Sequence, residues 1–278
     1  MSLTTLPAIA FPVIDPVLIQ IGPLAIRWYA LAYIAGLVGG WWYVRRLVRR
    51  PSLWAKSAAP YTPADIDDFL TWATLGVIIG GRLGYVLFYE PDRFLAEPAA
   101  ILYVWQGGMA FHGGLLGVIV AMIAFAHNRG QSALSLFDVI GAAAPIGLFF
   151  GRIANFINAE LWGRPTDLPW GMVFPTADEQ PRHPSQLYQA FGEGLVLFAI
   201  CAVAIALGGL KKPGLVGGLF TAGYGSARFL AEYVRAFDPQ IGLLFGVLTM
   251  GQLLSLPMIA VGLLMIASAQ RRTSHEPA

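Results

Sequence analysis

The chain of 278 residues is 56% apolar and only 12% charged, whereas soluble proteins average about 45–50% apolar and 25% charged residues. Its formal net charge of +2 does not indicate a nucleic-acid-binding surface, because the basic residues are concentrated in particular loops. The composition therefore predicts a polytopic membrane protein and argues against a soluble enzyme or a nucleic-acid-binding protein.

The beginning of the chain does not read as a cleavable signal peptide, since it lacks a positively charged start and contains three prolines within twenty residues. Seven apolar stretches of about 20 residues follow, the length needed to cross a hydrocarbon core of ~30 Å. We expect an all-α fold with seven transmembrane helices in a single integral membrane domain, 1–278. The expected spans lie near 22–45, 66–89, 101–126, 136–158, 187–208, 214–234 and 242–268.

Segment 160–186, between the fourth and fifth spans, is too polar to cross a membrane. Ten Lys and Arg residues lie in the loops after the odd-numbered spans and at the C-terminal end, and four lie on the opposite side. Basic loops stay in the cytoplasm. The distribution therefore predicts an outer N-terminus, a cytoplasmic C-terminus and an outer location for 160–186. The ten are Arg45, Arg46, Arg49, Arg50, Lys56, Arg129, Lys211, Lys212, Arg271 and Arg272; the four are Arg93, Arg164, Arg182 and Arg235.

The fourth span ends in polar residues, with Arg152, Asn155 and Glu160 close together. An ionised side chain at membrane depth costs several kcal/mol unless it meets a partner or water, so such residues usually mark a site. A guanidinium group has a planar set of donors that fits a phosphate, and every phospholipid carries a phosphate at the membrane interface. This stretch is the first candidate for a lipid-headgroup site.

The sixth span carries a second polar stripe. Tyr224, Arg228, Glu232 and Arg235 are spaced at i, i+4, i+8 and i+11, which predicts one helical face. Arg152 and Arg228 converging on one phosphate would stabilise the negative charge that develops on a departing phosphate ester. The alternative is two structural ion pairs, one between Arg152 and Glu160 and one between Arg228 and Glu232.

Two further residues carry suitable chemistry. His112 lies inside the third expected span among four glycines, which interrupt helical propensity and would let the backbone approach a headgroup. A histidine with its ordinary pKa of about 6.5 suits a general base for a thiol, although a structural role at a helix interface is equally open. Tyr29 offers a hydroxyl for a phosphate or ester oxygen, and its alternative role is an interfacial anchor.

Other polar residues have simpler explanations. Asp65, Asp67 and Asp68 open the second span after Thr62, where acidic residues cap a helix, so we do not expect a metal site there. Cys201 lies in an apolar run and is expected to be a buried small hydrophobe, with no disulfide available to a single cysteine.

Five segments together carry a resemblance to a known family. GRIANFINAELWG (151–163) resembles the signature of the prolipoprotein diacylglyceryl transferases, which are bacterial inner-membrane enzymes. GGRLGYVLFYEP, WQGGMAFHGGLLGV, RHPSQLYQAFGEG and YGSARFLAEYVRAFD resemble the other segments of that family, in the expected order and over essentially the whole chain.

This resemblance implies transfer of the sn-1,2-diacylglyceryl group of phosphatidylglycerol to the lipobox cysteine of a prolipoprotein, with release of glycerol phosphate. It implies no cofactor, because the lipid brings its own leaving group, and a periplasmic location for 160–186. In this family's pattern Arg152, Arg228, His112, Glu160 and Tyr29 would be catalytic, with His112 as the base. Substrate binding would involve Arg152, Asn155, Tyr224, Arg228, Glu232 and Arg235.

Two other functions remain open from the residues alone. A phospholipid-binding or transport protein would use the same arginines only to hold headgroups, although seven spans do not divide into the two similar halves typical of inverted-repeat transporters. A CDP-alcohol transferase would need an aspartate-bound metal, and the sequence shows no matching pattern of ligands.

Overall fold

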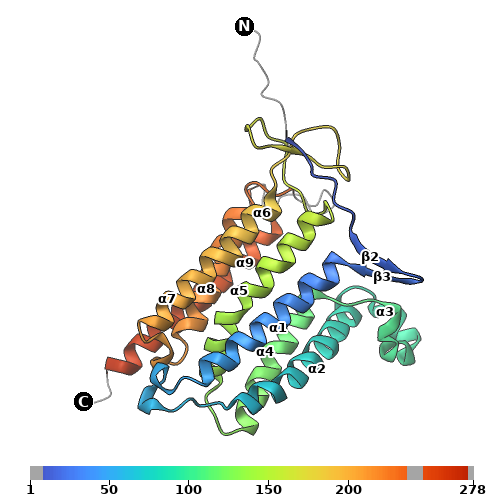
Figure 1. Ribbon diagram of the computed structural model, residues 1–278. Coiled ribbons are helices and arrows are strands. Elements are labelled where there is room, and N and C mark those ends of the chain that lie inside the picture. The colour runs from blue at the N-terminus through green and yellow to red at the C-terminus, as the bar shows by residue number, and fades with distance from the viewer. Residues whose placement is uncertain (1–8, 237–246, 275–278) are drawn as a thin grey trace. The chain divides into compact units, whose positions relative to one another are not determined.

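The computed structural model describes residues 9–236 and 247–274, and helices dominate it (Figure 1). A π-helix, η5 (Ala190–Val196), links α6 to α7 without a break. The α-helices are α1 (Trp28–Val48), α2 (Pro63–Phe88), α3 (Pro91–Ala96), α4 (Phe111–Asn128), α5 (Ala133–Ile157), α6 (Ser185–Gln189), α7 (Leu197–Ala206), α8 (Leu215–Ala231) and α9 (Met250–Ser274). Short 3₁₀ turns are η1 (Pro51–Leu53), η2 (Ala55–Ser57), η3 (Pro98–Leu102), η4 (Val104–Gln106) and η6 (Gly209–Lys211).

Five helical stretches are long and apolar enough to cross a membrane, and they coincide with five of the seven expected spans. The protein is therefore a multi-pass, mainly α-helical membrane protein. The helices α1 and α8 occupy the positions of the first and sixth expected spans. The start of the seventh expected span, 242–246, lies outside the described residues. The five stretches are Pro63–Phe88, Phe111–Asn128, Ala133–Ile157, Ser185–Ala206 and Met250–Arg272.

Four short strands accompany the helices. β2 (Val17–Ile21) and β3 (Leu24–Arg27) form an antiparallel hairpin that precedes α1, and β1 (Ile9–Ala10) pairs in parallel with β4 (Met172–Val173). The prediction that the first span begins at residue 22 is therefore wrong. A short apolar run suits a strand as well as a helix, so hydrophobicity alone could not place this boundary.

The third expected span also begins too early, because α4 starts at Phe111 rather than near residue 101. The preceding residues form η3 and η4, and carbonyl groups of η3 accept hydrogen bonds from the buried side chain of Arg82. Gly107 and Gly108 follow with φ of +88° and +77°, a conformation that favours glycine and stops a helix. These two glycines interrupt the helix as expected, whereas Gly113 is inside α4.

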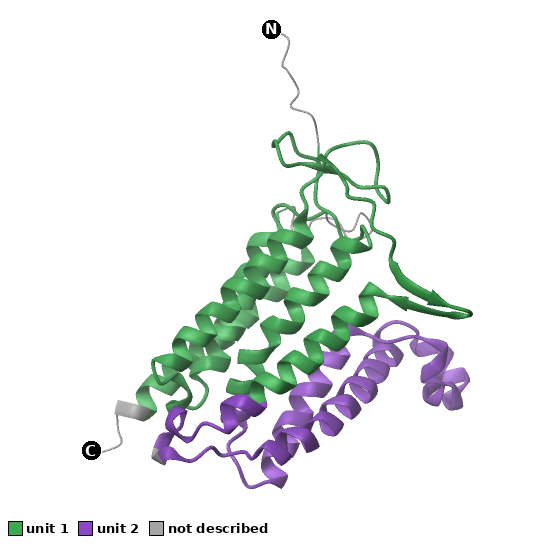
Figure 2. Ribbon diagram, in the orientation of Figure 1, with its two compact units in different colours: residues 1–44, 138–278 green, residues 45–137 purple. Residues whose placement is uncertain are grey.

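The chain divides into two compact units (Figure 2): residues 1–44 with 138–278 form unit 1, and residues 45–137 form unit 2. In unit 2, α2 and α4 pack through glycines. A Cβ added at Gly80 would lie 2.3 Å from the Gly113 carbonyl oxygen, so only glycine permits this approach. Close packing, rather than access for a headgroup, thus explains Gly113.

The start of α2 confirms the expected capping role for one of its three acidic residues, Asp65. Thr62 and Asp65 form a capping box, in which each side chain accepts from the backbone N–H of the other residue. Asp67 pairs with Arg45 and Asp68 pairs with Arg129. The acidic cluster therefore stabilises the helix start and its surroundings.

Unit 1 contains most of α1, α5, the continuous α6–η5–α7 helix, α8 and α9. Close contacts between small residues again set the packing: a Cβ added at Gly36 would lie 3.0 Å from Cα of Gly147, and one at Gly218 would lie 2.9 Å from the Gly262 carbonyl oxygen. Cys201 is fully buried in α7, as expected.

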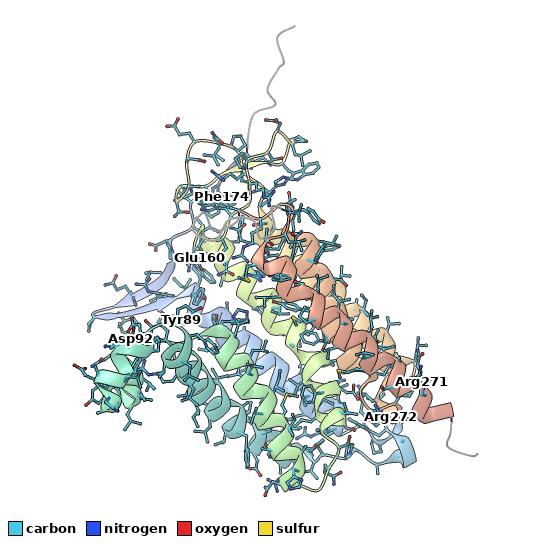
Figure 3. The ribbon with its side chains drawn as sticks, turned by 180° about the vertical axis from the view of Figure 1, so that it is seen from behind. Tyr89, Asp92, Glu160, Phe174, Arg271 and Arg272 are labelled. Carbon is cyan, nitrogen blue, oxygen red and sulfur yellow. The ribbon has the colours of Figure 1, made fainter. Side chains whose placement is uncertain are left out.

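One end of unit 1 is polar and is covered by segment 160–186. Figure 3 shows Glu160 and Phe174 at that end of unit 1 and Arg271 and Arg272 at the other. A small core of Phe11, Ala159 and Phe174 holds the segment against the end of α5. The segment is therefore a folded cap rather than a flexible linker.

Candidate functional site

Arg152 lies in the last turns of α5 and pairs with a buried carboxylate from the neighbouring helix. Its Nε and Nη2 groups each donate to Oε2 of Glu193 over 3.1 Å. The Glu193 side chain is fully buried and that of Arg152 is 15% exposed. Because Glu193 engages one edge of the guanidinium, the Nη1 group remains available to another acceptor.

In the described part of the chain, the alternative ion pair between Arg152 and Glu160 does not form. Glu160 Oε1 instead accepts from Asn155 Nδ2 at 2.7 Å. The reason is local: α5 ends at Ile157, and Ala159 and Leu161 have φ of +52° and +58°. The chain turns there, so Glu160 does not continue the helical face that carries Arg152.

The second of the two alternative ion pairs is present, since Arg228 Nη2 contacts Glu232 Oε1 at 2.6 Å. Glu232 is buried, and its Oε2 accepts from the Thr249 hydroxyl at 2.7 Å. Gly251 leaves the room that the carboxylate needs, because a Cβ there would lie 2.5 Å from Glu232 Cδ. Glu232 thus holds Arg228 from one side and is itself fixed by residues next to α9.

Arg235 does not extend the helical stripe as expected. The helix α8 ends at Ala231, and Arg235 follows in a turn, where it forms a β-bridge with Gly163. Its Nη1 lies 3.9 Å from Glu232 Oε1. Burial, with repulsion from Arg228 acting in the same direction, lowers the pKa of Arg235 to about 10. The side chain therefore remains cationic at neutral pH.

These charged side chains belong to one electrostatic neighbourhood. Arg235 interacts with Arg228, Glu232, Arg152 and Glu193. We call these five residues the arginine cluster. Arg152 from α5 and Arg228 from α8 thus both lie close enough to Arg235 to interact with it electrostatically. Tyr224, one turn before Arg228, interacts with both arginines and with Glu193.

Tyr29 lies at the start of α1, and its hydroxyl is 3.3 Å from that of Tyr33. The Tyr29 side chain also interacts electrostatically with Arg152 and Glu160. Tyr29, Arg152, Asn155 and Glu160, which the sequence placed in one site, are therefore neighbours in unit 1.

His112 is the second residue of α4, in its first turn rather than in the middle of a span, and it is exposed. It belongs to unit 2, whereas the arginine cluster belongs to unit 1. The assignment of His112 as a general base stays a prediction.

Comparison with known proteins decides the family. The sequence profile of the prolipoprotein diacylglyceryl transferases matches residues 16–268. The chain belongs to the prolipoprotein diacylglyceryl transferase family. It is 60% identical over 264 residues to a phosphatidylglycerol–prolipoprotein diacylglyceryl transferase of Methylocella silvestris, covering 95% of this chain and 97% of that protein. Proteins of the same name from Nitrobacter winogradskyi and Rhodopseudomonas palustris are 56% and 55% identical, covering 96% and 98% of this chain and 92% and 95% of theirs.

In this diacylglyceryl transferase, segment 160–186 supports the arginine cluster through contacts that the sequence did not reveal. Arg164 donates from Nε to the Arg235 carbonyl oxygen at 3.0 Å and from Nη2 to that of Glu232 at 3.3 Å. The Gly163 N–H donates to the His183 carbonyl oxygen, and a Cβ at Gly163 would lie 2.5 Å from the Val234 carbonyl oxygen. Gly163 and Arg164 thus position the turn after α8.

Sequence reasoning also missed Glu193. It lies 41 residues from Arg152 in the chain, so no helical spacing connects the two. A signal was present, because Glu193 is an acidic residue in an apolar span, and such residues usually have a partner. The π-helix η5 carries it, and π-helical turns often occur at functional sites.

Across residues 9–236 and 247–274, no group of three or more His, Cys, Asp or Glu side chains is arranged to hold a metal ion. The chemistry we consider for this site therefore rests on guanidinium groups, carboxylates, hydroxyls and amides.

Proposed function

We propose that this chain transfers the sn-1,2-diacylglyceryl group of phosphatidylglycerol to the cysteine thiol of a prolipoprotein lipobox. The sulfur attacks the phosphate-bearing carbon of the diacylglyceryl group. A C–S bond forms there, and the bond between that carbon and the phosphate oxygen breaks. The thiol proton passes to a base, and glycerol phosphate leaves. Membership of the family and the names of relatives at 55–60% identity support this activity.

One structural observation carries the proposal: Arg152 and Arg228 come from separate helices, interact with the same neighbours and are each paired with a carboxylate. A carboxylate on one edge fixes the orientation of a guanidinium group and leaves its other N–H groups for a ligand. Two oriented guanidinium groups would stabilise the charge that develops on the phosphate oxygen as the C–O bond breaks.

The charge of the arginine cluster suits a phosphodiester. Its three guanidinium groups and two carboxylates, Glu193 and Glu232, give one net positive charge. The phosphodiester of phosphatidylglycerol carries one negative charge, so binding would neutralise the cluster. Neutralisation matters here because an unbalanced charge is costly in a site of low dielectric.

The remaining residues have proposed roles around this headgroup. Tyr29, Asn155 and Tyr224 would line the phosphate and ester oxygens, and Glu160 would hold Asn155 in place through their hydrogen bond. Glu232 and Arg235 would fix the orientation of Arg228. His112 would accept the thiol proton, because only the thiolate is a strong nucleophile.

We further propose that α1 and α8 complete seven spans in the bacterial inner membrane. The N-terminus would lie outside and the C-terminus in the cytoplasm, with 160–186 as a periplasmic segment. The opposite placement of Glu160 and the basic pair Arg271 and Arg272 within unit 1 supports this orientation (Figure 3). Phosphatidylglycerol would then be used from the outer leaflet.

A direct assay separates this function from that of a phospholipid-binding or transport protein. Purified protein is incubated with radiolabelled phosphatidylglycerol and a lipobox peptide in detergent. The transferase should release glycerol phosphate and increase the mass of the peptide cysteine by one diacylglyceryl group, whereas a binding protein would retain labelled lipid without either product. A peptide with serine in place of the cysteine is the matched control.

A further inference from the structure

A row of buried polar side chains runs along the α6–η5 helix next to the arginine cluster. Gln186, Gln189 and Glu193 are spaced by three and four residues, which places them on one helical face. Their exposed fractions are 0%, 3% and 0%. Such groups normally occur inside a protein only when they are hydrogen-bonded, since an unpaired buried polar atom costs free energy.

Three atoms of this row have no partner among residues 9–236 and 247–274: Gln186 Oε1, Gln189 Nε2 and Glu193 Oε1. Arg228 Nη1, in the arginine cluster, is buried and equally without a partner in that part of the chain. The row therefore offers two acceptors and one donor to a ligand, and Arg228 offers a further donor.

Both ends of the row are tied to the residues proposed to hold the phosphate. Gln186 Nε2 donates to the Glu160 carbonyl oxygen at 2.6 Å, and Glu160 in turn binds Asn155. At the other end, Glu193 binds Arg152. Along the helix, Gln189 lies between Gln186 and Glu193, the residues that make these two contacts. A ligand that meets Gln186 and Gln189 therefore lies directly beside the phosphate position.

The chemistry of the two glutamines favours a neutral diol. A hydroxyl group can donate to Gln186 Oε1, and a second hydroxyl can accept from Gln189 Nε2. In the headgroup glycerol of phosphatidylglycerol, one carbon bears the phosphate ester and each of the other two carbons bears a hydroxyl. An ethanolamine headgroup would place an ammonium group, which has only donors, against the donating Nε2 of Gln189.

We propose that Gln186 and Gln189 form a subsite that binds the two hydroxyl groups of the headgroup glycerol and so selects phosphatidylglycerol as the lipid substrate. The proposal rests on the transferase function and adds specificity-determining residues to it. The subsite binds the part of the lipid that leaves as glycerol phosphate, whereas the arginines bind the phosphate itself.

The test is a competition between two lipids that differ only in the headgroup hydroxyls. Full-length protein receives a lipobox peptide and equal amounts of phosphatidylglycerol and phosphatidylpropanol in mixed micelles. Mass spectrometry measures the ratio of glycerol phosphate to propyl phosphate released. Both lipids have the same phosphodiester, so the ratio reports only the recognition of the hydroxyls.

The decisive variant is Gln189→Met, which keeps the shape of the side chain and removes its donor. We expect the ratio to fall about tenfold, the usual consequence of losing one hydrogen bond to a substrate group. Gln186→Glu, which keeps the acceptor oxygen, should lower the ratio less than Gln186→Met.

Ser185→Ala is the matched control, because Ser185 is equally buried and donates to the Leu161 carbonyl oxygen rather than pointing into the row. It should leave the ratio unchanged even if it slows both reactions. An unchanged ratio in Gln189→Met, whether its rates are normal or equally reduced, would overturn the proposal. An unchanged ratio together with a raised KM for the peptide in Gln189→Met would also overturn it, because the row of buried polar side chains would then bind the peptide.

Failure of the transferase function has a different outcome. If wild-type protein releases neither phosphate ester, the transfer reaction itself is refuted. Native mass spectrometry then measures how strongly wild-type protein and Gln189→Met retain each lipid. The subsite requires wild-type protein to prefer phosphatidylglycerol and the variant to lose that preference.

Discussion

The arginines inside the two units of this membrane protein have opposite surroundings. In unit 2, Arg82 uses all five of its N–H groups on the backbone carbonyl oxygens of Ala100, Ile101, Tyr103, Gly107 and Gly108. In unit 1, Arg152 and Arg228 are each held on one edge by a carboxylate. A saturated guanidinium organises the chain, whereas a guanidinium with unused donors is suited to a ligand.

The difference shows why charge in a span is not by itself evidence of a site. Arg82 and Arg152 are both arginines, and both lie in apolar stretches of the sequence. What separates them is the number of donors that the protein leaves unused, and only the three-dimensional structure reveals this number.

The largest expected effect follows from changing the arginines of the cluster. Arg152→Lys and Arg228→Lys keep the charge but lose the planar donor set, and we expect each to lower kcat/KM for transfer about 100- to 1,000-fold. Thermal unfolding in detergent should change little, because the buried carboxylate keeps a cation. Arg93→Lys, in an exposed pair with Glu90, is the control. Wild-type activity in either cluster variant would refute the proposed roles.

Changing Arg82 should instead affect stability. Arg82→Gln leaves several backbone carbonyl oxygens without donors, including that of the buried Ala100, and we expect a loss of about 3 kcal/mol in the free energy of unfolding. Limited proteolysis should show cleavage within 97–110 that the wild-type protein resists. If Arg82→Gln resists the protease as well as the wild type does, the five hydrogen bonds do not hold this segment.

Glu193→Gln sharpens the comparison, because it removes the charge that orients Arg152 and retains an acceptor of the same shape. We expect kcat/KM to fall about 10- to 100-fold, the usual cost of losing a group that orients a binding residue. The loss should appear in kcat more than in the KM for lipid. A parallel measurement on Glu232→Gln tests whether the two carboxylates act alike.

The fold was predictable where the physical signal is local. Seven apolar stretches coincide with helices, and the capping role of Asp65 follows from its position after Thr62. The boundaries at residues 22 and 101 were wrong, because apolar residues before α1 form a hairpin and those before α4 bind Arg82.

The sequence offered candidate residues for the site but could not pair all of them. The sequence named Arg152, Arg228 and Glu232, and the i+4 pair was correct. Glu193, the partner of Arg152, was missed because it approaches from another helix. Gln186 and Gln189 gave no sequence signal because they are polar residues near a span end. Pairings across helices depend on packing, which periodicity does not encode.

A smaller effect is expected at Gly163, in the segment that positions the turn after α8. Gly163→Ala places a Cβ against the Val234 carbonyl oxygen and the His183 backbone, and we expect a loss of about 1–3 kcal/mol in stability together with reduced transfer. Gly151→Ala is the control, since a Cβ there meets no atom within 4 Å in the described part of the chain. Equal behaviour of the two variants would contradict the account.

The smallest expected effect is a pH dependence from His183. Burial lowers the pKa of His183 below its ordinary value of 6.5. The neutral form is therefore favoured in the folded state. The contribution of His183 to the free energy of unfolding is complete above about pH 6.5 and is lost as the pH falls through the pKa of the folded state. The thermal midpoint of the wild-type protein should drop between pH 6.5 and 5 more steeply than that of His183→Asn. Identical slopes would exclude this contribution.

The most direct measurement is an experimental structure of the protein with phosphatidylglycerol bound. The account predicts one phosphate whose oxygen atoms lie within about 3 Å of guanidinium nitrogens of both Arg152 and Arg228, the distance of a charge-assisted hydrogen bond. A headgroup bound elsewhere, or a phosphate that contacts only one of these two arginines, would contradict it.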